Sequence, residues 1–98
     1  MRHSIITTMI NNPFHPGIFL QELLDDMNIT AYRLAKDTFM PATRVSDILK
    51  QRRSITPDTA LRLSKYFGSS PSYWLNLQSS YELGKCHPKH IEQIQAVA

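Results

Sequence analysis

Hydrophobic residues recur along this chain at the three- and four-residue spacing of an α-helix. Leu20, Leu23, Leu24 and Met27 form the clearest stripe, because positions i, i+3, i+4 and i+7 lie on one face of a helix. No stretch alternates apolar and polar residues for long enough to predict a strand. The pattern therefore predicts an all-α protein.

Capping residues predict where the helices begin and end. Pro16, Pro57 and Pro71 each follow a residue that can cap a helix, and proline is favoured at the first helical position. We expect helices from His15-Pro16 to residue 28, over 31–37, over 42–50, over 57–67 and from 71 to about 84. Apolar residues spaced by three over 88–97 predict at most a short, marginal extra helix.

Length and composition indicate one small domain with tails. We expect a flexible N-terminal segment over 1–14, a helical domain over 15–84, and a C-terminal tail or short helix over 85–98. The single cysteine, Cys86, rules out a disulfide framework and agrees with a cytoplasmic location. No apolar run approaches the roughly 18 residues of a membrane span, so no membrane partner is expected.

The net charge of +3 is unevenly distributed. Residues 16–29 carry three acidic side chains and no basic one, whereas residues 33–65 carry eight basic and three acidic side chains. A basic segment of this kind is typical of a protein that binds a polyanion. An ordinary solvated helix face remains an alternative explanation of the same charges.

The two short helices predicted over 31–37 and 42–50 are the most informative part of the chain. A tight turn, Thr38-Phe39-Met40, joins them, and the outward positions of the second helix are small, polar or basic. A helix that enters the DNA major groove needs little bulk near its N-terminus, hydrogen-bonding groups toward base edges and cations toward phosphates. The spacing therefore favours a DNA-binding helix-turn-helix over a plain helical hairpin.

An ordered set of motifs adds to this interpretation. It consists of HPG at 15–17, AYRLA at 31–35, ITPDTALRL at 55–63 and FG-S-P-x-x-WLNLQ at 67–78. With these motifs the stretch from His15 to Leu83 resembles the HigA family of addiction-module antitoxins, also called VapI-like, a branch of the XRE/Cro helix-turn-helix repressors. The resemblance implies a five-helix, lambda-repressor-like domain.

The resemblance also implies a function. The protein would be the antitoxin of a type II toxin-antitoxin system, a cytoplasmic homodimer that represses transcription at an inverted-repeat operator in double-stranded DNA. It would also bind and neutralise a cognate mRNA-cleaving toxin. Two alternatives stay open, namely a free-standing XRE-type repressor without a toxin, and a protein-interaction module that uses the fold only as a scaffold.

The resemblance places site residues on helix faces. Base-reading residues would be Ala42, Thr43, Ser46 and Asp47, and phosphate-binding residues would be Thr30, Arg33, Arg44, Lys50, Arg52 and Arg53. The family usually has glycine where Phe39 and Gln51 stand. If the position of Phe39 requires a positive φ, a bulky residue is unfavourable there, so we expect either a reshaped turn or a Phe39 side chain that fills a gap in the core.

The last predicted helix carries more aromatic surface than so small a core needs. We expect part of it to form a two-fold dimer interface with Tyr73, Trp74, Leu77 and Tyr81.

Other groups of reactive residues point to no further chemistry. Cys86, His87 and His90 offer three ligands where a structural zinc site normally has four, and no third orienting group accompanies them for nucleophilic catalysis. We expect no metal, no cofactor and no enzymatic activity.

Overall fold

The computed structural model describes residues 14–97, which form five α-helices and one short 3-10 helix. The α-helices are α2 (Pro16–Met27), α3 (Ala31–Thr38), α4 (Ala42–Leu49), α5 (Pro57–Phe67) and α6 (Pro71–Lys85). The predicted all-α, five-helix class is confirmed, and each of the five helices lies where the capping pattern predicts it. The predicted flexible segment over residues 1–14 falls almost entirely outside the described residues.

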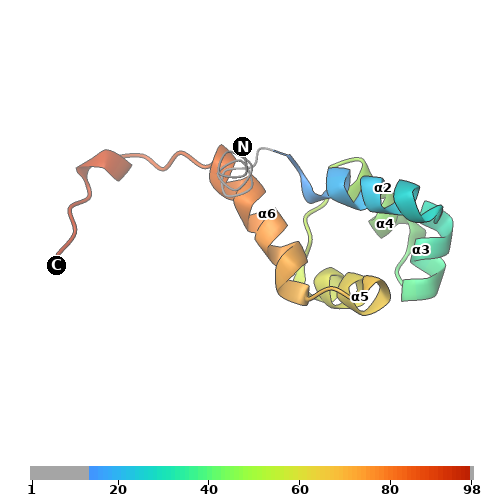
Figure 1. Cartoon of the computed structure of the whole chain (residues 1–98). Helices are drawn as coiled ribbons and strands as arrows, with labels where there is room; N and C mark the ends of the chain where they lie inside the picture. Colours follow the sequence, from blue (N-terminus) through green and yellow to red (C-terminus); the bar gives the residue numbers. More distant parts are fainter. Residues whose placement is uncertain (1–13, 98) are drawn as a thin grey trace.

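The C-terminal segment differs from the marginal helix predicted over residues 88–97. Only Ile91–Gln93 forms a single 3-10 turn, and residues 86–97 are exposed throughout. Figure 1 shows this segment leading away from the helical body. The helix does not extend because its apolar side chains Ile91, Ile94 and Val97 have no face of the body to bury against.

Four of the five α-helices begin at a residue whose side chain accepts a hydrogen bond from the helix's own backbone. These capping residues are His15, Thr30, Thr56 and Ser70. Such bonds satisfy N–H groups that otherwise lack a partner at the start of a helix. The sequence signals that predict helix starts therefore act through side-chain caps.

The core lies between α2, α3, α4 and the crossing pair α5 and α6. It is formed by apolar side chains from all five helices, the turn before α4 and the loop before α5, namely Leu20, Leu24, Leu34, Ala35, Met40, Val45, Ile48, Ile55, Ala60, Leu63, Trp74 and Leu77. Trp74 and Leu77 are only 1% and 5% exposed. Their prediction as dimer-interface residues is therefore wrong, because the chain's own core already covers both side chains.

A close backbone contact holds α2 against α4. Gly17 is buried in the first turn of α2, and a Cβ atom built there would collide with the carbonyl oxygen of Ile48 in the last turn of α4. His15 lies beside this contact, where its Nδ1 accepts from the Gly17 N–H at 2.9 Å and its ring stacks edge-on against Tyr81 of α6. The HPG motif thus joins α4 to the rest of the fold.

Candidate nucleic-acid interface

Helix α4 presents one face to the core and the other to solvent. Val45 and Ile48 are fully buried, whereas Ala42, Thr43 and Lys50 are exposed and Ser46 and Asp47 are half-buried. All four residues predicted to read bases therefore share the outward side of α4, together with Lys50 at its C-cap. The Arg53 side chain reaches this side and pairs with Asp47, while Ala42 and Thr43 stay exposed.

The N-terminus of α4 differs from those of the other described α-helices because it has no side-chain cap. Pro41 precedes the helix and makes no side-chain hydrogen bond to it. The first N–H groups of α4 are therefore available to an external acceptor, and the positive end of the helix dipole favours a phosphate there. A small residue, Ala42, and a residue able to donate and accept, Thr43, stand at this end.

The turn between α3 and α4 keeps the geometry that glycine would normally provide. Phe39 has φ 58° and ψ 37°, in the left-handed region, and is 86% exposed. Both expectations for Phe39 are therefore wrong, because the turn is not reshaped and the ring fills no core gap. Gln51, after α4, has φ 64° in the same region. At both residues the backbone adopts a conformation that is unfavourable for any residue with a Cβ.

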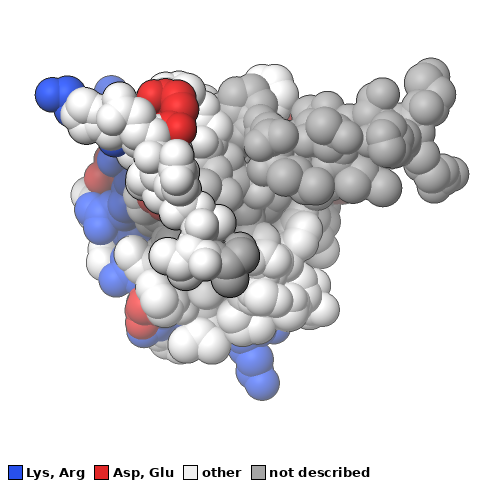
Figure 2. Space-filling view, turned by 90° about the vertical axis from the view of Figure 1, so that its left-hand side faces the viewer, with Lys and Arg blue, Asp and Glu red and all other residues white. Residues whose placement is uncertain are grey.

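Basic side chains gather beside α4. The loop after α4 and the start of α5 enclose a hollow of about 470 Å³ lined by Arg44, Arg52, Arg53, Ser54, Thr56 and Thr59. Three of the residues predicted to bind phosphates thus lie around one depression. Figure 2 shows Lys and Arg side chains collected along one edge of the molecule, with acidic side chains among them.

Every acidic residue of the basic segment is paired with an arginine. Asp37 accepts from Arg33 at 3.2 Å, Asp47 from Arg53 at 3.5 Å, and Asp58 from Arg44 at 2.5 Å. Three predicted phosphate-binding residues therefore carry a carboxylate partner in this structure, whereas Lys50 and Arg52 have no ion pair among the described residues. Asp47, predicted to read a base, is at the same time a partner of Arg53.

Two of these carboxylates have lowered pKa values. The pKa of Asp37 lies below its usual value because the Tyr66 hydroxyl donates to it and Arg33 lies beside it. The pKa of Asp58 is lowered by hydrogen bonds from Arg62 and then Arg44. Both groups are therefore charged at neutral pH and offset part of the positive charge of this surface.

Thr30, predicted to bind phosphate, lies at the start of α3 and is exposed. Its hydroxyl accepts from the backbone N–H of Arg33 and caps the helix. A hydroxyl that accepts in this way retains its own proton for donation, so capping and phosphate contact are compatible.

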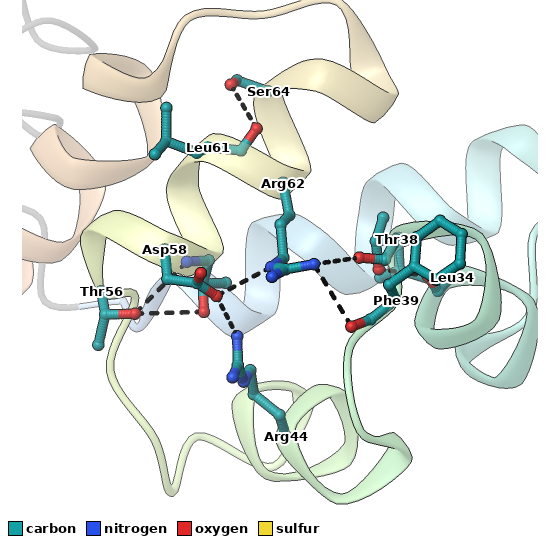
Figure 3. A network of polar contacts seen from close by, with 10 residues as sticks. Leu34, Thr38, Phe39, Arg44, Thr56, Asp58, Leu61, Arg62 and Ser64 are labelled. Atoms are coloured by element: carbon teal, nitrogen blue, oxygen red, sulfur yellow. Dashed lines mark hydrogen bonds and ion pairs between the residues drawn. The ribbon is translucent and has the colours of Figure 1, made fainter.

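Asp58 and Arg62 of α5 belong to this surface, although sequence reasoning did not select them. Arg62 donates to Asp58 and also to the carbonyl oxygens of Thr38 and Phe39, at the end of α3 (Figure 3). The spacing of Asp58 and Arg62, four residues apart on a helix, was the sequence signal for the ion pair. Nothing in the spacing indicated the contact with the turn.

Gln78 is a second residue whose role depends on the fold. Its side chain is buried, and its Oε1 accepts from the backbone N–H of Ile55 at 2.8 Å. This bond holds Ile55, at the end of the loop that carries Arg52 and Arg53, against α6.

Comparison with known proteins identifies the family of this fold. The family model described as helix-turn-helix matches residues 20–74. The chain is 44% identical over 70 residues to virulence-associated protein I of Dichelobacter nodosus, a match that spans 70% of this chain and 65% of that protein. This chain thus matches a little less than two thirds of the length of that relative.

Two solved structures are similar in both sequence and fold. One is an addiction module antidote protein of the HigA family from Coxiella burnetii, with 45% identity, a TM-score of 0.77 and coverage of 83% of this chain and 89% of that one. The other is Pseudomonas aeruginosa antitoxin HigA with the higBA promoter, with 35% identity, a TM-score of 0.78 and coverage of 89% and 100%.

Proposed function

The chain belongs to the helix-turn-helix family, and on this premise we propose that it is a sequence-specific DNA-binding repressor and the antitoxin of a type II toxin-antitoxin module. In this proposal α4 is the recognition helix, and the protein binds the operator of its own promoter. It also binds and neutralises a cognate mRNA-cleaving toxin. No catalytic role is proposed.

The observation that carries the DNA-binding part is the free outer side of α4 beside the basic hollow. An exposed helix face with a small residue and hydroxyls at its uncapped start suits the major groove. The neighbouring cations Lys50 and Arg52 are not paired within the described residues and suit the phosphates on either side.

The solved relatives supply the second line of support. The structure of Pseudomonas aeruginosa HigA contains its promoter, and antitoxin GraA, 33% identical to this chain, was solved in complex with its operator. The toxin part of the proposal is supported by the names of the relatives, since HigA and GraA are named as antitoxins and the Coxiella burnetii protein as an addiction module antidote protein.

The proposal includes a homodimer. Two copies related by a two-fold axis would place two α4 helices about one DNA turn apart, roughly 34 Å, and would require an inverted repeat. Tyr73 and Tyr81 remain as interface candidates on α6, because Tyr73 is exposed and Tyr81 is half-buried.

A selection experiment tests the DNA-binding part. Duplexes retained by the protein from a random-sequence pool should converge on an inverted repeat that also occurs upstream of the gene. Thr43→Ala should then relax the preference at one base pair of each half-site, at a cost of roughly 1–3 kcal/mol. A pool that stays random after repeated rounds would refute sequence-specific binding.

The toxin part needs a separate experiment. Co-expression with the adjacent reading frame should yield a complex that copurifies with this chain and restores growth that the adjacent product alone inhibits. A neighbour that is harmless when expressed alone would leave a free-standing repressor as the function.

A further inference from the structure

The carboxylate of Asp58 lies where α5 meets α4 and the turn between α3 and α4. It is in the first turn of α5 and accepts from Arg44 of α4 at 2.5 Å and from Arg62 at 2.9 Å. Arg62 in turn donates to the Thr38 carbonyl oxygen at 2.9 Å and to that of Phe39 at 3.4 Å. Figure 3 shows Arg44 of α4 pointing toward Asp58, and Arg62 of α5 lying between Asp58 and the two backbone carbonyls of the turn.

The Arg44–Asp58 bond is the direct polar link between α4 and α5 among the residues that the structure describes. Helix α4 otherwise packs on α2 and α3. The carbonyl groups that Arg62 binds belong to the end of α3 and to the left-handed residue Phe39, which are the backbone groups that lack partners at a helix end. Asp58 thus orients two side chains, namely Arg44 of α4 and Arg62, which contacts the turn that leads into α4.

Arg44 is also one wall of the basic hollow. Its side chain is 26% exposed, which leaves it accessible to a phosphate. A carboxylate bonded to this guanidinium cancels its charge and competes with any phosphate for the same N–H groups. Because phosphate contacts contribute affinity without sequence information, this competition weakens binding to DNA of any sequence.

We propose that Asp58 is a specificity-determining residue of the DNA-binding surface, which withholds Arg44 from arbitrary phosphates and holds α4 at the angle that base reading requires. This inference rests on the proposed DNA-binding function. Base contacts tolerate displacements of only about 0.5 Å, whereas a salt-dependent phosphate contact does not depend on such a fixed geometry. Losing Asp58 therefore strengthens binding to arbitrary DNA and impairs discrimination between sequences.

Asp58→Asn tests the proposal with two duplexes, the one selected by the wild-type chain and a scrambled duplex of the same composition. On the scrambled duplex, one freed phosphate contact in each subunit of a dimer should steepen the slope of log K against log salt by about 1.8 and tighten binding about tenfold. The ratio of selected to scrambled affinity should fall about tenfold as a result.

Matched variants separate this role from charge and from folding. Asp26→Asn removes the same charge from α2, where Asp26 has no ion pair among the described residues, and should leave the ratio unchanged. Asp58→Glu keeps the charge and should retain most of the ratio. Arg62→Gln removes the donor to the turn but keeps the Arg44 pair, so affinity for the selected duplex should fall while the salt slope stays constant. Thermal melts of all four variants identify any loss of folding.

Two outcomes would overturn the proposal. If Asp58→Asn leaves the salt slope on scrambled DNA unchanged, Arg44 is not withheld by Asp58. If both duplexes gain affinity equally, Asp58 contributes only charge and has no part in specificity. Failure of the proposed function itself is distinguishable, because the wild-type chain would then show no preference between the two duplexes.

Discussion

Gly17→Ala should displace α4, the proposed recognition helix, through a single methyl group. Gly17 lies in the first turn of α2, and a Cβ atom added there would meet the carbonyl oxygen of Ile48 at 2.0 Å and its carbonyl carbon at 3.0 Å. Real Cβ atoms almost never approach backbone atoms below 3.0 Å. Both atoms belong to the main chain, so no flexible side chain can move aside.

The required displacement sets the magnitude of the effect. Restoring ordinary contact moves α2 and the last turn of α4 apart by roughly 1 Å, and overpacking of this size costs about 1–3 kcal/mol. For a domain of this size each kcal/mol lowers Tm by about 4–8 °C. We therefore expect a drop of about 4–24 °C, with weaker binding to the selected duplex at temperatures where the variant is still folded.

Gly68→Ala is the matched control. Gly68 has φ +77° and no atom within 4 Å of its Cβ position, so this substitution tests backbone conformation alone. It should cost about 1 kcal/mol and leave DNA affinity of the folded protein unchanged. The reasoning is refuted if Gly17→Ala melts within about 2 °C of the wild type, or if it lowers Tm but binds the selected duplex normally.

Phe39→Gly should stabilise the protein by about 0.5–1 kcal/mol, because the relief of left-handed strain, about 1–2 kcal/mol, exceeds the added freedom of glycine in the unfolded chain. A thermal melt measures this, and an unchanged or lower Tm would contradict it. Burial, offset in part by a bond with the Arg53 backbone, lowers the pKa of His15 below 6.5. The neutral ring is the form that caps α2, so its contribution to the free energy of unfolding should be full above pH 6.5 and decline as the pH falls below it. Urea titrations at several pH values measure this free energy, and the decline should be absent from His15→Ala. Lys50→Gln should flatten the salt slope of DNA binding by about 0.9 per subunit, and an unaltered slope would remove Lys50 from the interface.

The predictable part of this fold is the part determined by local signals. Proline after a capping residue locates the starts of α2, α5 and α6, and the stripe of Leu20 and Leu24 correctly indicates a buried face. The outward side of α4 also follows from periodicity alone. The capping signals are local because hydrogen bonds within one helix turn produce them. The periodicity is local because residues three and four positions apart share one face of a helix.

The rest depends on which elements meet in space. Trp74 looked like surplus aromatic surface, yet the crossing of α5 and α6 encloses it completely. The role of Arg62 requires knowing that α5 passes beside the end of α3, 24 residues earlier in the chain. Phe39 is a further example, because it lies in the left-handed region with its ring in solvent. Phenylalanine has a poor propensity for this conformation, so its place there follows from the turn and not from the residue itself.

Removing single major-groove atoms from the selected duplex tests most directly whether the outer side of α4 reads bases. Guanines would be replaced one at a time by 7-deazaguanine and thymines by uracil, which changes the major groove and leaves the minor groove intact. We predict losses of affinity in two clusters whose centres lie about one helical turn, roughly 34 Å, apart. Binding that is indifferent to every replacement would contradict the account.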